Sequence, residues 1–269
     1  METAASIGRA FLPAKSFFEQ VGEMVRLTAQ TLLSAVKPPY PYGEEFIGQF
    51  LFALQLCWFP LLVSTVAICF GAPGMQAANV LNLFGALDRL GGFFVLAAIR
   101  EIAPFVTAVV VAGVAGTAIT ADLGARKIRE ELDALQVLGV DPIKNLVVPR
   151  FLALMLVTGL LDIYALIFGI TGGILAEFLY KQPLGGFFST FLTSASILDL
   201  AGSVIKCTLF GAIIAVVCSY KGMTASGGAA GVGRAVNQAV VISFLGVFAF
   251  NYVFTQTLLA TNPELQTIR

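Results

Sequence analysis

Long apolar segments alternate with short polar ones along the chain, and this alternation predicts a bundle of membrane-spanning helices. Uncharged or nearly uncharged stretches cover about residues 46–70, 99–121, 148–178, 198–220 and 236–260. Each is long enough to cross a hydrocarbon core of about 30 Å, which takes about 20 helical residues. The pattern therefore predicts an all-α integral membrane protein with five transmembrane helices.

Residues 71–99 are harder to assign. They are mostly apolar, but glycines, a proline and the charged pair Asp88 and Arg89 interrupt them. We interpret the segment as an extracytoplasmic turn and a helix that leads into the second span. A sixth crossing is the alternative.

Basic residues predict the orientation of the spans. Most of the 16 Lys and Arg residues lie before the first span, between spans two and three, and between spans four and five. Loops rich in Lys and Arg stay on the cytoplasmic side of a membrane. Five crossings of the inner (plasma) membrane then place the N-terminus in the cytoplasm and the C-terminus outside. Six crossings would divide these basic segments between the two sides.

The first 43 residues are predicted to form an amphipathic helical segment, and residues 44–269 form the membrane domain. One helical stripe of this N-terminal segment is apolar, with Ile7, Phe11, Ala14, Phe18, Val21, Val25 and Leu32. The other side carries Arg9, Lys15, Glu19, Glu23 and Arg26. Such a helix lies in the membrane interface. A soluble helix docked on the protein's own spans is the alternative.

The polar segment between spans two and three predicts a cytoplasmic helix at about residues 123–139. Ile128, Leu132 and Leu135 fall on one helical face. Expected pairs four residues apart are Arg126–Glu130, Lys127–Glu131 and Arg129–Asp133. Gly139 is a suitable residue to end the helix, and Asp141 with Pro142 prevents it from resuming. The helix suggests a docking surface for another subunit; the alternative is that it only shields the end of the bundle.

Few charged residues lie within or beside the spans. Arg100 and Glu101 precede Pro104 at the start of the second span. Charge near hydrocarbon is costly and usually faces a cavity or a partner, although interfacial snorkelling is the alternative for this pair. We expect Asp162 and Lys206 to pair with each other or with a neighbouring subunit.

Small residues line span two, and Gly169 and Gly173 lie four residues apart in span three. Small side chains let helices approach closely in lipid. The pattern fits packing within one subunit as well as an interface between subunits.

The amino-acid composition disfavours several classes of protein. The chain is 58% hydrophobic and 12% charged, whereas soluble domains average about 25% charged residues. It has no His, which disfavours zinc hydrolases, Ser-His triads and haem proteins. Its net charge of zero gives no indication of a nucleic-acid partner. Residues 222–234 are rich in glycine but match no nucleotide-binding spacing, so we expect no cofactor in this chain.

Several motifs between residues 100 and 151 resemble the MlaE/YrbE family of ABC-transporter permeases. They are Arg100-Glu101-Ile102-Ala103-Pro104, Ala112-Gly113-Val114-Ala115-Gly116, Asp122-Leu123-Gly124, Glu131-Leu132-Asp133, Gly139-Val140-Asp141-Pro142 and Pro149-Arg150. The resemblance covers roughly residues 44–262. The amino-acid sequences of residues 122–133 and 254–264 are most similar to those of the YrbE permeases of actinobacterial Mce systems.

The resemblance implies a set of partners. These are a second YrbE-type permease subunit, a cytoplasmic ABC ATPase dimer that binds ATP and Mg, Mce-domain proteins on the outer face, and a lipid substrate. The helix at 123–139 would be the coupling helix, with ATPase contacts at Arg126, Arg129, Glu130, Glu131, Asp133, Leu135, Gly139 and Asp141. The lipid pocket or the seat for Mce proteins would include Arg100, Glu101, Pro104, Val114 and Asn251.

Two positions depart from the family pattern. Val114 stands where many relatives carry Arg, and Asn251 stands where many carry an acidic residue. Both changes make the inner lining less polar, which suits a long apolar substrate.

The sequence therefore predicts a non-catalytic permease subunit of an ATP-driven, Mce-type transporter. We expect it to import fatty-acid, mycolic-type or sterol lipids across the inner membrane. The alternatives are a membrane anchor for Mce proteins that moves no lipid, and an intramembrane lipid-modifying enzyme.

Overall fold

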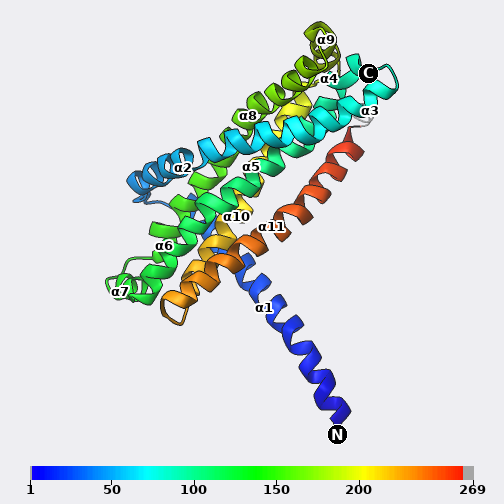
Figure 1. Ribbon diagram of the computed structural model, residues 1–269. Coiled ribbons are helices and arrows are strands. Elements are labelled where there is room, and N and C mark those ends of the chain that lie inside the picture. Colours follow the sequence, from blue (N-terminus) through cyan, green and yellow to red (C-terminus); the bar gives the residue numbers. More distant parts are fainter. Residues whose placement is uncertain (1, 263–269) are drawn as a thin grey trace.

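The protein is an antiparallel bundle of long helices, as a computed structural model shows (Figure 1). The structure describes the backbone of residues 2–262 and the side chains of residues 18–262. Five helical stretches are long and apolar enough to cross a membrane, namely Gly43–Leu83, Leu87–Ile128, Ile143–Leu179, Ile197–Met223 and Gly228–Thr261. The predicted all-helical class with five spans is confirmed, and the chain is a multi-pass membrane protein.

The spans alternate in direction, so the bundle has two distinct ends. The α7 end carries helix α7 (Glu131–Val137), which follows the second span. The α9 end carries helix α9 (Leu184–Ser194), between the third and fourth spans. Chain direction therefore places the start of the first span at the α7 end and the end of the fifth span at the α9 end (Figure 1).

The first span is longer than expected. It consists of α2 (Gly43–Cys69), the π-helical segment η1 (Phe70–Gln76) and α3 (Ala77–Leu83). Pro73 lies inside η1, where it has no N–H to donate to the helical ladder, and a wide π turn accommodates this loss. Most of the segment expected to turn after residue 70 therefore continues the first span, and the turn itself is short and precedes Leu87.

The second span is built from six segments, whose bounds are η2 (Leu87–Arg89), α4 (Leu90–Phe94), η3 (Val95–Ile102), α5 (Ala103–Val111), η4 (Ala112–Gly116) and α6 (Thr117–Ile128). The expected helix leading into this span is thus present. The described residues form five spans, and the alternative of a sixth crossing is not realised.

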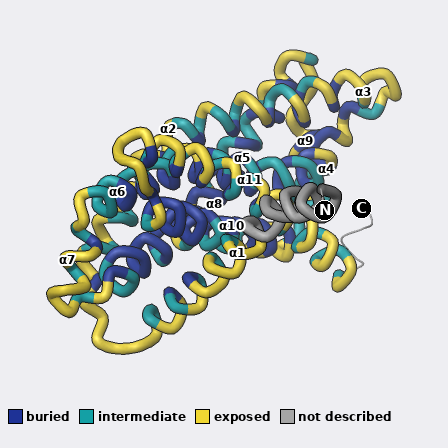
Figure 2. Tube along the Cα trace, turned by 90° about the horizontal axis from the view of Figure 1, so that it is seen from below, coloured by how far each residue is buried: buried dark blue, intermediate teal, exposed yellow. Residues whose placement is uncertain are grey.

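The third and fourth spans form the centre of the bundle. The third joins η5 (Ile143–Val147) to α8 (Val148–Leu179), and the fourth is α10 (Ile197–Met223). Few residues of the fifth span, α11 (Gly228–Thr261), are buried, and the same holds for α2. Figure 2 shows buried positions on the inner helices and exposed positions along the outer turns of α2, α3 and α7. The exposed apolar faces are suited to contact with lipid.

Small residues bring these helices together within one subunit. Ala108, Ala112 and Ala115 are buried in the main core. A side chain added at Gly116 would meet the Sγ atom of Cys218 at 2.8 Å, and one at Gly173 would meet the Phe187 ring at 2.9 Å. Of the two interpretations of the small-residue pattern, packing inside the subunit accounts for these positions.

A substitution at Gly172 tests this packing. A Cβ atom there would lie 2.6 Å from the backbone N of Phe70, so α8 and the first span would have to separate. We expect Gly172→Ala to lower the free energy of unfolding by about 1–3 kcal/mol, measured by thermal unfolding in detergent. Gly48→Ala is the control, because nothing lies within 4 Å of its Cβ position. Equal melting temperatures for the two variants would contradict this packing.

Helix α1 (Glu2–Val36) leaves the bundle at the α7 end and runs across the direction of the spans (Figure 1). Of the predicted apolar stripe, Phe18, Val25 and Leu32 are exposed. Leu27 and Thr31 are buried. The stripe residues Ile7, Phe11 and Ala14 and the charged Arg9 and Lys15 lie outside the part whose side chains are described. The described half thus has one face packed on the bundle and several exposed apolar side chains.

Candidate functional site

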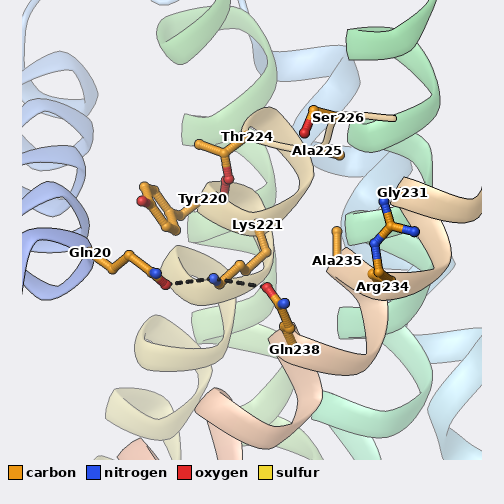
Figure 3. Close-up of a pocket in the computed structure, with 10 residues that line it drawn as sticks. All are labelled: Gln20, Tyr220, Lys221, Thr224, Ala225, Ser226, Gly231, Arg234, Ala235 and Gln238. Atoms are coloured by element: carbon orange, nitrogen blue, oxygen red, sulfur yellow. Dashed lines mark hydrogen bonds between the residues drawn. The ribbon is translucent and has the colours of Figure 1, made fainter. Parts of the chain in front are cut away.

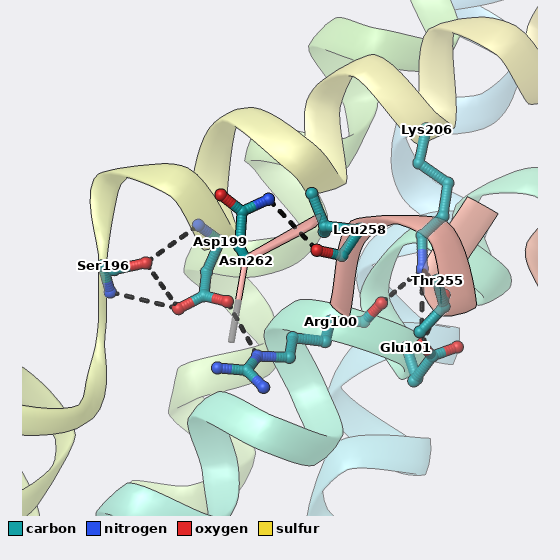
Figure 4. A network of polar contacts seen from close by, with 8 residues as sticks. All are labelled: Arg100, Glu101, Ser196, Asp199, Lys206, Thr255, Leu258 and Asn262. Carbon is teal, nitrogen blue, oxygen red and sulfur yellow. Dashed lines mark hydrogen bonds and ion pairs between the residues drawn. The ribbon is translucent and has the colours of Figure 1, made fainter. Parts of the chain in front are cut away.

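A cluster of charged and polar side chains crosses the bundle near the α9 end (Figure 4). Glu101 in η3 accepts hydrogen bonds from Asn251 Nδ2 at 2.7 Å and from Thr255 Oγ1 at 2.9 Å. Lys206 Nζ lies 3.6 Å from its Oε1 atom. Arg100 Nε forms an ion pair of 2.7 Å with Asp199. We call Arg100, Glu101, Asp199, Lys206, Asn251 and Thr255 the Glu101 cluster.

Pro104 explains why this cluster forms here. Proline has no N–H, so the carbonyl of Arg100, four residues earlier, loses the donor that an α-helix would supply. Lys206 Nζ donates to that carbonyl at 2.5 Å. The preceding η3 is a wide π turn, a feature found often at functional sites. The local sequence thus leaves the Arg100 carbonyl without a helical donor inside the bundle, and Lys206 of α10 supplies the missing hydrogen bond.

The side chains of the cluster differ in their access to solvent or lipid. Those of Asp199 and Lys206 are almost completely buried, whereas that of Glu101 is 39% exposed. Buried charges are retained when they are paired and hydrogen-bonded. Glu101 is therefore the most exposed of the four charged side chains in the cluster.

Four of the five residues predicted for a lipid pocket or Mce seat come together. Arg100, Glu101, Pro104 and Asn251 lie in or beside the cluster. Val114 does not, because it lies in η4, about 20 Å further along the same span at a rise of 1.5 Å per residue.

Other polar partners within the spans differ from the expectation or were not predicted. Lys206 forms its ion pair with Glu101. Asp162 instead accepts a hydrogen bond from Ser203 at 2.7 Å, so the expected Asp162–Lys206 pair does not form among the described contacts. Asp199 and Thr255 also belong to the Glu101 cluster, although the sequence pattern did not assign them to it.

An apolar groove lies between the first and second spans. It is lined by Ser64 and Ile68 of the first span and by Ile102, Phe105, Val106, Val109 and Val110 of the second. Ile102 directly follows Glu101 in the chain, so the groove and the Glu101 cluster share the second span. This arrangement suits a molecule with a polar head and an apolar chain.

At the opposite end, the expected continuous helix over 123–139 is interrupted. Helix α6 ends at Ile128, Glu130 adopts a left-handed backbone conformation with φ of 60°, and α7 begins at Glu131. The interruption turns the chain and prevents the expected pairs four residues apart. Lys127 instead pairs with Asp133 at 3.0 Å, and Arg129 with Glu131 at 2.7 Å.

The other residues predicted for ATPase contact hold α7 in place. Leu132 is buried, and Leu135 packs on the core. Gly139 has a φ of 78°, as expected of a helix-ending glycine, and the Val140 N–H donates to the carbonyl of Leu135. Asp141 accepts from the Ile143 N–H at 2.9 Å at the start of η5. The end of α7 then presents Val137 and Leu138, which are 88% and 76% exposed.

A buried arginine joins three spans at the α7 end. The side chain of Arg150 in α8 is 1% exposed. Its Nη2 atom lies 2.7 Å from Asp122 of α6 and 3.3 Å from Glu45 of α2. Arg126 also pairs with Asp122, at 3.2 Å. We call Glu45, Asp122, Arg126 and Arg150 the Arg150 cluster; only Arg126 of this group was among the predicted site residues.

Five apolar spans, a charged cluster near one end and an exposed apolar tip at the other define a multi-pass membrane protein with a candidate site at each end. The family model described as "Permease MlaE" matches residues 50–257. The chain belongs to the MlaE family of permeases. The predicted family is therefore confirmed.

Named relatives agree with this family. A "probable ABC transporter permease protein" of Rickettsia typhi is 32% identical over 90% of this chain and 93% of its own length. The "intermembrane phospholipid transport system permease protein MlaE" of Haemophilus influenzae is 32% identical over 68% of this chain and 70% of its length. The chloroplastic protein "trigalactosyldiacylglycerol 1" of Arabidopsis thaliana is 35% identical over 67% of this chain and 52% of its length.

Family membership shows which role this subunit has in its transport system. The chain is an ABC permease subunit and is not the catalytic part of its system. ATP is bound by a partner ATPase, as expected from the sequence.

Proposed function

We propose that this chain is the permease of an ATP-driven transporter that moves lipids, with the Glu101 cluster and the apolar groove receiving the lipid. The observations that carry the proposal are the partly exposed Glu101 and an apolar groove on the same span. The name of the Haemophilus influenzae relative, which refers to phospholipid transport, supports the same class of substrate.

The energetics of lipid transfer favour a sheltered path with an external energy source. Each buried CH₂ group contributes about 0.8 kcal/mol, so exposing a chain of about 16 carbons to water costs on the order of 13 kcal/mol. The groove supplies apolar contact for such a chain. A partner ATPase supplies the work that directional release requires.

The α7 end is the proposed ATPase contact and faces the cytoplasm. Lys127, Arg129 and Lys144 lie at this end, as the concentration of basic residues on the cytoplasmic side requires. Val137 and Leu138 give α7 an apolar tip that is exposed in the isolated subunit. In this orientation α1 lies in the inner interface and the C-terminus is outside.

A finer proposal is that the transporter is of the Mce type. It rests on the amino-acid sequences of residues 122–133 and 254–264. Such a transporter would also contain a second permease subunit and Mce-domain proteins on the outer face. Fatty-acid, mycolic-type or sterol lipids, moved inward, are then the proposed substrates.

Removing the Glu101 carboxylate tests the lipid site. Glu101→Ala deprives Asn251, Thr255 and Lys206 of a shared partner and leaves the buried lysine without its counter-charge. We expect lipid transport to fall at least tenfold, equivalent to about 1.4 kcal/mol, because the unpaired buried lysine disturbs the site and the carboxylate is lost. The measurement is transfer of labelled lipid in proteoliposomes that contain the complete complex.

The control for this variant is Glu44→Ala, an exposed carboxylate in the first turn of α2. Both variants should retain the ATPase subunit during purification. Wild-type transport by Glu101→Ala would contradict the assignment of the site.

The proposed function itself is tested by the ATPase activity of the purified complex. A lipid transporter should hydrolyse ATP faster when lipid substrate is supplied, and deletion of the chain should reduce lipid transport by cells. An inert complex with unchanged transport after deletion would favour the alternative, a membrane anchor for Mce proteins.

A further inference from the structure

A second polar pocket lies at the α7 end, away from the Glu101 cluster. Helices α1, α10 and α11 enclose it, and its volume is about 240 Å³. Its lining includes Gln20, Lys221, Ser226, Arg234 and Gln238 (Figure 3). Water occupies about 30 Å³ per molecule in the liquid, so the pocket has room for a phosphate group.

Lys221 is buried in this pocket without an acidic partner. It is 7% exposed, and Nζ donates to Gln20 Oε1 at 2.7 Å and to Gln238 Oε1 at 3.2 Å. Both acceptors are neutral amides, and no ion pair to Lys221 exists within residues 18–262. Glu23, on the same face of α1 as Gln20, accepts from the Tyr220 hydroxyl instead. A buried ammonium normally requires a counter-charge.

A second cation lines the same pocket. Arg234 of α11 is exposed and forms no hydrogen bond or ion pair with any side chain that the structure describes. It lies across the pocket from Lys221 (Figure 3). Ser226 also lines this pocket, and the N-terminus of α11 at Gly228 lies next to Ser226 in the chain. A hydroxyl, a guanidinium and the positive end of a long helix are all groups that bind phosphate oxygens.

We propose that this pocket binds a phosphate group, with Lys221 and Arg234 as the two cationic ligands. The phosphate is that of an anionic phospholipid headgroup, because α1 beside the pocket exposes Phe18, Val21 and Val25, which suit acyl chains. A bound headgroup would join α1 to α10 and α11. The inference concerns the α7 end and does not depend on the proposed transport function.

The test uses the full-length chain in detergent. Native mass spectrometry measures binding of phosphatidylglycerol, with phosphatidylcholine as the zwitterionic comparison. We expect Arg234→Gln and Lys221→Gln each to weaken phosphatidylglycerol binding about tenfold, since each removes a charge-assisted contact. Arg89→Gln is the matched control, because Arg89 is exposed at the α9 end. Arg234 is itself exposed, so its variant tests the site even if Lys221→Gln fails to fold.

A parallel measurement distinguishes the two sources of phosphate. If inorganic phosphate raises the melting temperature of the wild type but not of Arg234→Gln, while phosphatidylglycerol binding is unaffected by the variants, the site takes free phosphate. Selective loss of phosphatidylglycerol binding in both pocket variants supports a lipid headgroup. If neither probe distinguishes Arg234→Gln from Arg89→Gln, the proposal is wrong.

Discussion

Replacing Val137 and Leu138 by Asp together should abolish ATP-driven lipid transport while the chain still inserts in the membrane. Both side chains are exposed at the tip of α7, and clustered apolar side chains of this kind mark interaction sites. Central interface residues often contribute 2 kcal/mol or more, which is about a thirtyfold loss of affinity for each. The measurement is co-purification of the ATPase subunit with the tagged permease, together with labelled-lipid transport.

Leu83→Asp is the control for these substitutions. Leu83 is 84% exposed but lies at the α9 end, at the close of the first span. It should leave ATPase co-purification unchanged. Normal ATPase binding by the Val137→Asp, Leu138→Asp variant would show that α7 is not the contact.

Arg150→Ala should have the largest effect on stability. The substitution leaves Asp122 and Glu45 without their shared partner where α2, α6 and α8 meet. The two carboxylates are 40% and 41% exposed and Asp122 keeps Arg126, so the expected cost is about 1.5–3 kcal/mol for the lost charge-assisted hydrogen bonds, to which the cavity left by the shorter side chain adds. We expect a clear fall in the melting temperature of the purified chain. Arg150→Lys should restore part of the loss, because it keeps the charge but not the planar pair of donors.

An exposed ion pair provides the comparison. The side chains of Arg129 and Glu131 are 61% and 42% exposed, and such pairs contribute about 0–1 kcal/mol. Arg129→Ala should therefore change the melting temperature little. If Arg150→Ala and Arg129→Ala are equally stable, the Arg150 cluster does not hold the three spans together.

Hydropathy predicted the number of spans because crossing a membrane imposes a minimum apolar length on each helix. The same signal could not place the end of the first span, since Pro73 and the glycines near it suggest a turn. In the structure Pro73 lies within a π-helical turn, and the helix continues to Leu83. Local composition therefore indicates where a helix is strained but not whether it ends.

The sites were predictable only in part, for a related reason. Arg100 and Glu101 stood out because charge in a span is rare, but Asp199 and Thr255 come from distant helices and only packing shows their contact. Arg150 was noted only as part of the Pro149-Arg150 motif, and its buried ion pairs with Glu45 and Asp122 appear only in the folded structure. The spacing of charges before α7 suggested a continuous helix, whereas Glu130 takes a left-handed conformation that spacing does not predict.

The most direct test of the account is site-specific photo-crosslinking in living cells from position 138. With a photoreactive residue in place of Leu138, the account predicts a crosslink to the ATPase subunit, and none from the same residue at position 83. Labelling of position 138 by a membrane-impermeant reagent added outside the cell, or crosslinks from it to lipid alone, would contradict the account.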